Sequence, residues 1–391
     1  MPHIRSGDQG ASRGLHWSGV KNVLTLMCNQ IGSQGGRRVE ARIIGLKGCG
    51  KTTLVTALAE GRGEGHVATV HVGDPRVRAL SEVFQPKKTT FAEFRVREVA
   101  WPEASARKGE MERYLDALAG GQVYLHVLRA FDNPMLGEPV RPVADLQELD
   151  REFLLFDLIR VERAFERAKK APLTDVGKVA LAKCQEALEA EHPLRDVAFD
   201  EPQLTFIRGY QFLTLVPQLL VVNTESGLEW DRSALESAAL ASSPSGLASS
   251  ASGSAAPARK ILAFPFVDAL EVSRLSPDEQ SEFAEALGLP GPAAEVVTQA
   301  AFKELGLISF LTTGSDEVRA WPIRGGETAR EAAGAIHSDI ERGFIRAEVV
   351  HYDDFMRCGS MKACREQGTF RVEGKDYIVA DGDIINFRFN V

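Results

Sequence analysis

The sequence lacks any long apolar run: nothing in its 391 residues approaches the roughly 20 apolar residues that a membrane-spanning helix needs. Cysteine is scarce. Its five residues are scattered along the chain, and this odd number fits a reducing cytoplasm better than a disulfide framework. Positive charge is not in excess, because the formal net charge is −8. This balance argues against a protein that coats nucleic acid, although a local basic face remains compatible with it. We therefore expect a cytoplasmic protein without a membrane partner.

The composition is otherwise that of an ordinary globular protein, with 44% hydrophobic and 26% charged residues. At roughly 150 residues per domain, the length suggests two or three domains. Residues 1–39 are mostly polar and rich in Gly, Ser and Arg, without the apolar core and cleavage site of a secretory signal. We expect them to form a disordered N-terminal extension.

The most informative stretch matches G-x-x-x-x-G-K-[ST], the phosphate-binding loop. It follows a strand-like run at 41–44 and precedes a helical pattern at 54–58, the context that gives the motif its meaning. Glycines let backbone N–H groups turn toward a phosphate, and the helix N-terminus adds its positive end. Lys51 would reach the β- and γ-phosphates, and Thr52 would hold Mg²⁺. The predicted nucleotide-binding residues here are Gly45, Leu46, Lys47, Gly48, Cys49, Gly50, Lys51, Thr52 and Thr53.

Cys49 allows two interpretations. A helix N-terminus lowers the pKa of a nearby thiol, which would make Cys49 reactive. Alternatively, the loop needs a small packed residue at this position.

Strand-like runs alternate with helical patterns around this loop, at 67–72, 91–99, 122–128, 218–223 and 261–267. This alternation predicts an α/β fold, the parallel sheet of P-loop nucleoside triphosphatases with helices on both faces. We assign residues 40–144 and 205–306 to this nucleotide-binding domain. Within it, Ser, Ala, Gly and Pro dominate residues 236–258 and predict a disordered loop.

Residues 145–204 interrupt the sheet pattern. Apolar residues such as Leu149, Phe153 and Phe156 recur at helical spacing, and a break at 172–177 separates two helices. We expect an antiparallel helical hairpin inserted into the nucleotide-binding domain. Its basic residues either form an ordinary solvated helix face or a docking surface.

The last segment, 307–391, has short β-like runs around a helical pattern at 328–343, with Thr328 as its N-cap. We expect a small α+β domain. Four of its stretches strongly resemble the TGS domain of the YchF family, the Obg-like ATPases: 317–321, 333–339, 343–348 and 373–391. The stretch Asp74-Pro75-Arg76 also resembles a segment of that family.

The resemblance implies an ubiquitin-like TGS domain and a nucleotidase that binds ATP or GTP with Mg²⁺. It further implies association with the ribosome or ribosomal RNA, for which the TGS domain and the hairpin are the candidate surfaces. In this family the base is recognised by N-x-x-E, which places Asn223 and Glu225 at the base, although Glu225 comes one residue early.

The resemblance weakens in the motifs for hydrolysis. The family's D-x-x-G is expected where this chain reads Arg-Val-Arg-Glu-Val-Ala-Trp at 95–101, so its aspartate and glycine are both missing. We assign no catalytic residue and expect nucleotide binding with weak or no hydrolysis. The alternative is a catalytically dead pseudo-GTPase that acts as a protein-interaction scaffold. The oligomeric state is not predicted.

Overall fold

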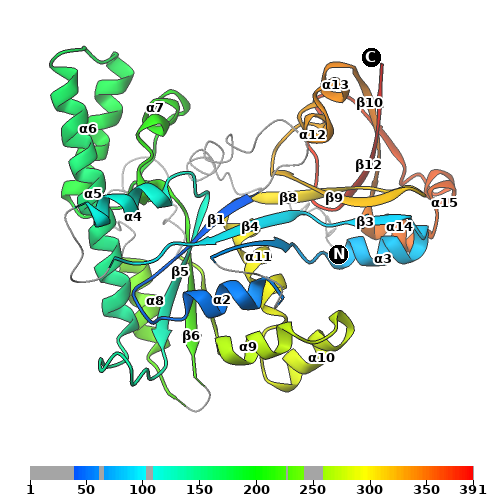
Figure 1. Ribbon diagram of the computed structural model, residues 1–391. Helices are drawn as coiled ribbons and strands as arrows, with labels where there is room; N and C mark the ends of the chain where they lie inside the picture. Colours follow the sequence, from blue (N-terminus) through cyan, green and yellow to red (C-terminus); the bar gives the residue numbers. More distant parts are fainter. Residues whose placement is uncertain (1–38, 61–65, 103–108, 226–227, 242–258, 391) are drawn as a thin grey trace, which may run out of the picture.

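The computed structural model describes residues 39–60, 66–102, 109–225, 228–241 and 259–390 (Figure 1). The expected N-terminal extension, apart from Val39 in the first strand, lies outside these residues. The described residues form two six-stranded sheets. None of the described helices is both long enough and apolar enough to cross a bilayer.

The first sheet has the strand order β2–β4–β1–β5–β6–β7. All neighbouring strands are parallel except β2, which is antiparallel to β4. The strands are β1 (Val39–Ile44), β2 (Val67–His71), β4 (Glu93–Glu98), β5 (Val123–Ala130), β6 (Gln218–Thr224) and β7 (Ile261–Phe264). Every residue of β5 is buried, as expected for a central strand that is covered on both faces.

Helices cover both faces of this sheet (Figure 1). Val123, Leu125 and Val127 of β5 point to the face packed by α2 (Lys51–Leu58), α9 (Phe266–Ser273) and α11 (Ala293–Glu304). Tyr124 and Leu128 point to the opposite face. That face is packed by α4 (Glu110–Leu118), α5 (Pro142–Ala168) and α8 (Arg232–Ala241). The short helix α10 (Pro277–Ala286) follows α9. The α/β fold class predicted from the sequence is confirmed.

The hairpin consists of α5 and α6 (Asp175–Glu189), which pack through their own apolar cluster together with α7 (Glu201–Ile207). Three short 3-10 turns complete this region: η2 (Leu194–Asp196), η3 (Arg208–Tyr210) and η4 (Leu213–Leu215). The buried carboxylate of Asp157 on α5 accepts hydrogen bonds from the N–H groups of Leu213 and Thr214 and from the Thr214 hydroxyl. Asp157 therefore joins the hairpin to the chain that re-enters the sheet.

The second sheet has the order β11–β10–β12–β8–β9–β3. Its strands are β3 (Lys88–Thr90), β8 (Leu307–Thr312), β9 (Glu317–Arg324), β10 (Phe344–His351), β11 (Arg371–Glu373) and β12 (Asp383–Phe389). The helices α12 (Ala329–Ile336) and α13 (Ser338–Arg342) cover one face. The other face packs on α14 (Tyr352–Cys358), α15 (Met361–Glu366) and α3 (Pro75–Phe84). We call this sheet with its five helices the C-terminal unit.

Two elements of the C-terminal unit come from far upstream. The helix α3 and the strand β3 lie between β2 and β4 in the chain, yet they complete the core and one edge of the second sheet. Pro75 at the first position and Asp74 as N-cap start α3, because Asp74 accepts the N–H of Arg76 at 2.9 Å.

Several expected boundaries differ from the structure, and for three of them the reason is visible. The loop predicted at 236–258 begins later, because residues up to Ala241 continue α8, where Leu235 and Ala239 are buried; residues 242–258 lie outside the described residues. The strand predicted at 261–267 ends at Phe264, since Pro265 caps α9. The helix predicted at 328–343 is two helices, because His337 has an extended backbone between them.

Candidate functional site

The loop from Gly45 to Gly50 joins the buried strand β1 to α2. Gly45, Gly48 and Gly50 have φ values of +143°, +74° and +100°, which L-residues with side chains rarely adopt. A Cβ at Gly45 would lie 2.4 Å from the carbonyl oxygen of Val127, and one at Gly50 would lie 2.4 Å from the Asn223 amide. The glycines are therefore required both by conformation and by close packing.

Lys51 is the first residue of α2, and its side chain is almost fully buried. Its ammonium donates to the carbonyl oxygens of Gly45 at 2.8 Å and Leu46 at 2.9 Å. The loop thus curls around the ammonium, which places a fixed positive charge beside the N-terminus of α2. Both features favour an anion such as a phosphate.

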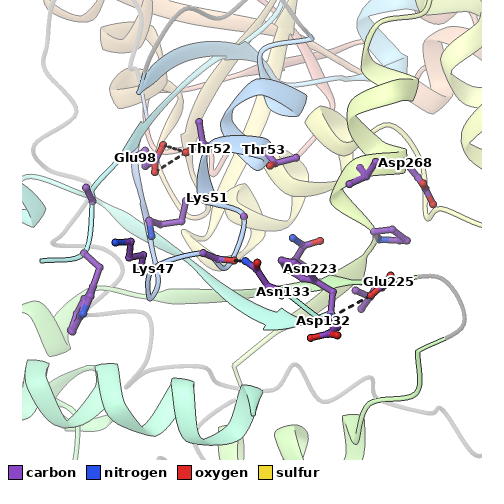
Figure 2. A pocket seen from close by; sticks show the side chains of 18 residues that line it. Lys47, Lys51, Thr52, Thr53, Glu98, Asp132, Asn133, Asn223, Glu225 and Asp268 are labelled. Atoms are coloured by element: carbon purple, nitrogen blue, oxygen red, sulfur yellow. Dashed lines mark hydrogen bonds between the residues drawn. The ribbon is translucent and has the colours of Figure 1, made fainter. Parts of the chain in front are cut away.

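Thr52 is paired with a carboxylate that the sequence analysis had not assigned to the site. Its hydroxyl lies 3.1 and 3.0 Å from the two carboxylate oxygens of Glu98, the last residue of β4 (Figure 2). His66 Nδ1 lies 3.0 Å from the same carboxylate. The aspartate of the expected D-x-x-G is missing, but an acidic residue does stand at this point. Glu98 provides it from the strand beside β1, and Trp101 follows three residues later.

Asn223, predicted to contact a base, braces the site. It is buried at the end of β6, where its amide nitrogen donates to the carbonyl oxygen of Cys49 at 3.2 Å. Its amide oxygen accepts the N–H of Phe266 at 3.1 Å. Asn223 therefore ties the phosphate loop to the start of α9.

Glu225 lies at the other end of the site, where it accepts the N–H of Asp132 at 3.3 Å. The neighbouring Asn133 donates to the carbonyl oxygen of Gly48 at 3.3 Å. These contacts join the loop after β5 to both ends of the site.

A cavity of about 940 Å³ connects these groups. Its phosphate-loop end carries Lys47 and Lys51, and the far end carries the carboxylates of Asp132, Glu225 and Asp268 (Figure 2). Its volume lies at the upper end of the range of small-molecule sites. The predicted residues that line it are Lys47, Gly48, Gly50, Lys51, Thr52, Thr53, Asn223 and Glu225. Gly45, Leu46 and Cys49 do not line it.

Of the two interpretations of Cys49, the structure favours packing. The side chain is 2% exposed and belongs to the apolar cluster beneath the sheet. Burial raises the pKa of its thiol above the ordinary value, which disfavours the reactive thiolate.

The remaining cavity residues were missed because they carry no motif. They are Glu98, Ala100, Trp101, Phe131, Asp132, Asn133, Thr224, Pro265, Val267 and Asp268. For Glu98 the sequence offers a partial signal, an acidic residue at the carboxyl end of a predicted strand, but only the structure shows that this strand neighbours the phosphate-loop strand.

Comparisons with known proteins agree with this architecture. The family model YchF-GTPase_C, described as a protein of unknown function (DUF933), matches residues 307–390. The "Ribosome-binding ATPase YchF" of Bacillus subtilis is 35% identical over 371 residues, which cover 90% of this chain and 99% of that protein. The protein of the same name from Escherichia coli O157:H7 is 33% identical over 372 residues, covering 89% and 98%.

A solved structure, that of the Schizosaccharomyces pombe YchF GTPase, superposes with a TM-score of 0.77. It covers 92% of this chain and 100% of its own, at 23% sequence identity. At 23% identity this similarity shows that the two proteins share a fold, and nothing further.

Proposed function

This chain belongs to the YchF family, and from that premise we propose that it binds ATP or GTP with Mg²⁺ in the cavity over Gly45–Thr52 and associates with the ribosome. The observation that carries the nucleotide part is the phosphate loop itself. Lys51 is buried and held by two loop carbonyls, and three loop glycines adopt positive φ values that residues with side chains rarely adopt. Such a loop suits a phosphate chain better than an uncharged ligand.

The residues present fit a magnesium ion. Mg²⁺ prefers oxygen ligands, and the hydroxyl of Thr52 and the carboxylate of Glu98 lie within hydrogen-bonding distance at the phosphate end of the cavity. We assign Thr52 and Glu98 to hold the ion together with the phosphates. When bound, Mg²⁺ would neutralise charge on the β- and γ-phosphate oxygens. Lys51 would orient the same phosphates.

Hydrolysis should be slow. In the family pattern a glycine stands three residues after the acidic residue, whereas this chain has Trp101. Its ring packs edge-on against Tyr114, with the ring centroids 5.1 Å apart. This contact ties the residue to α4. Trp101 is therefore not free to bring its backbone N–H to the γ-phosphate as the family's glycine does, and losing one well-placed electrostatic contact of this kind costs about 10²–10³ in rate. We therefore expect phosphate release well below the ~1–10³ s⁻¹ of typical enzymes.

The C-terminal unit and the hairpin are the proposed ribosome-binding surfaces. Two of the arginines on the second sheet, Arg346 and Arg388, are paired with Glu348. Because one carboxylate already offsets part of this positive charge, we expect binding to follow shape more than charge and to depend only weakly on salt. The pseudo-GTPase scaffold has less support, since a scaffold has no need for the paired Thr52 and Glu98 or the buried Lys51.

Calorimetry tests the nucleotide part. Full-length protein is titrated with Mg-ATP and Mg-GTP, beside Lys51→Ala and the control Lys87→Ala, whose side chain is 81% exposed in the C-terminal unit. We expect binding in the wild type and control and its loss in Lys51→Ala. Equal binding, or none, in all three proteins contradicts the proposal. Co-sedimentation of the full chain with ribosomes at two salt concentrations tests the second part.

A further inference from the structure

The segment 74–90 is shared between the two structural units. It leaves the first sheet after β2, forms α3 and β3 inside the C-terminal unit, and returns to the first sheet as β4. It begins with Asp74-Pro75-Arg76, a motif to which the nucleotide site assigns no role.

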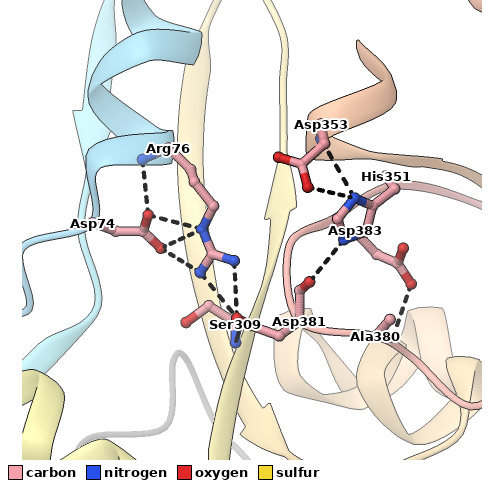
Figure 3. Close-up of polar contacts among 8 residues, drawn as sticks. All are labelled: Asp74, Arg76, Ser309, His351, Asp353, Ala380, Asp381 and Asp383. Atoms are coloured by element: carbon pink, nitrogen blue, oxygen red, sulfur yellow. Dashed lines mark hydrogen bonds and ion pairs between the residues drawn. The ribbon is translucent and has the colours of Figure 1, made fainter. Parts of the chain in front are cut away.

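Arg76 is held between two carboxylates (Figure 3). Its Nε and Nη2 donate to Asp74 at 3.0 and 2.8 Å, and its Nη1 donates to Asp381 at 3.0 Å. A second contact, from Nη2 to Asp381, measures 3.3 Å. Partial burial lowers the pKa of Arg76, but the hydrogen bonds to Asp74 and Asp381 outweigh it and raise the pKa above its ordinary value.

Asp381 is in turn anchored within the C-terminal unit. Its carboxylate accepts the N–H of Ser309 on β8 at 2.9 Å, and its backbone carbonyl lies 3.2 Å from Nε2 of His351. The next residue, Gly382, has a φ of +86°, and a Cβ there would lie 2.8 Å from Nη1 of Arg76. The loop around Asp381 is thus shaped to let the guanidinium approach closely.

The rest of the segment is packed just as firmly. Val77 and Leu80 of α3 are fully buried in the cluster that contains Leu311 and Ile384. The strand β3 pairs in parallel with β9 from Lys88 to Thr90. The segment therefore has little freedom to move independently of the C-terminal unit.

Continued through β4, the segment reaches the phosphate site. After β3, the chain enters β4, which pairs with both β1 and β2 and ends at Glu98 beside Thr52. A single stretch of chain thus runs from Arg76, on the C-terminal unit, to the carboxylate at the phosphate end of the cavity.

We propose that residues 74–98 form a mechanical link, latched by Arg76 between Asp74 and Asp381, through which the phosphate site and the C-terminal unit constrain one another. A ligand that contacts Thr52 and Glu98 changes the partners of the residue that ends β4. Through residues 74–98 this change alters the C-terminal unit. By thermodynamic reciprocity, loosening the C-terminal unit must then change the phosphate end of the cavity. The nucleotide-driven half of this inference rests on the proposed function, and the other half does not.

Hydrogen–deuterium exchange of the full-length chain tests the link. The variants are Arg76→Ala, Asp381→Ala and Arg76→Lys, which keeps the charge but loses the fork that holds two carboxylates. The matched control is Lys87→Ala, because the Lys87–Asp316 pair joins the same segment to the same unit but both side chains are 81% exposed. The peptides to follow cover 307–312, 380–385 and, as the remote readout, 93–99.

Without nucleotide, we expect Arg76→Ala and Asp381→Ala to speed exchange about tenfold or more at 307–312 and 380–385, the loss expected for a charge-assisted hydrogen bond. The decisive result is faster exchange at 93–99 as well, with Arg76→Lys intermediate and Lys87→Ala unchanged. Faster exchange confined to the C-terminal peptides overturns the link, since a purely local role predicts that pattern.

With Mg-ATP, we expect slower exchange at 307–312 in the wild type and no such change in Arg76→Ala, although calorimetry still shows binding. Binding without any change at 307–312 in the wild type also overturns the link. If calorimetry detects no binding to the wild type, the proposed nucleotide function fails, and the measurement without nucleotide alone decides the link.

Discussion

The fragment 307–391, which the family model matches almost in full, should not fold stably alone. It lacks α3, whose Val77 and Leu80 are fully buried against it. Burying two such side chains contributes about 3–6 kcal/mol. Phe84 of α3 also stacks on Phe355, with the ring centroids 5.3 Å apart. A domain of this size has a total free energy of unfolding of about 4–13 kcal/mol, so losing the burial of Val77 and Leu80 removes a comparable amount.

Urea denaturation followed by circular dichroism measures this directly. The comparison is a fragment in which residues 74–91 precede 307–391 through a flexible linker, so that α3 and β3 can dock. We expect the joined fragment to unfold cooperatively and the shorter one to have little or no transition. If both unfold with free energies within about 1 kcal/mol of each other, the burial calculation is wrong. Deleting 307–391 would likewise uncover Val77 and Leu80, so point variants are the better probe of ribosome binding.

Three further predictions concern single residues. Glu98→Ala should reduce the Mg²⁺ dependence of ATP affinity in calorimetry, whereas Glu98→Asp should retain part of it; equal Mg²⁺ dependence in all three proteins would remove Glu98 from the metal site. Asp157→Ala leaves two buried N–H groups without their acceptor and should lower the free energy of unfolding by about 2–6 kcal/mol in denaturant titrations. Burial lowers the pKa of His126 to about 3, so between that pH and about 6.5 the unfolded chain binds a proton that the folded chain does not. The free energy of unfolding therefore decreases as the pH is lowered through this window, and His126→Leu should reduce the loss between pH 7 and pH 5 by about 2 kcal/mol relative to the wild type.

The local features of the nucleotide-binding half were predictable because they follow from short-range rules. Strand, glycine loop and helix around Lys51 depend on adjacent residues, and the run of apolar residues in β5 marks a strand covered on both faces. The helical spacing of Leu149 and Phe153 likewise marks α5. These signals need no knowledge of what packs against them.

Glu98 was missed for a different reason. The expected motif couples an aspartate to a glycine, and residues 95–101 contain neither. Glutamate has one more methylene than aspartate, so the carboxylate of Glu98 can reach Thr52 although the sequence around it does not match the motif. Only the pairing of β1 with β4 brings the two residues together. Strand neighbours across a sheet are not visible in local sequence.

The placement of α3 and β3 shows the same limit on a larger scale, and it determines how the two units are joined. The chain passes between them at three places, each short: from His71 to Pro75, from Thr90 to Glu93, and from Glu304 to Leu307. Independent motion of two domains is the usual expectation when a single flexible linker joins them. Here three short crossings join the units, while the β3–β9 pair and the Arg76 ion pairs fix the crossing segment 74–90 within the C-terminal unit. The C-terminal unit is therefore held to the same strand that presents Glu98 to Thr52, and a change at either end has a short covalent path to the other.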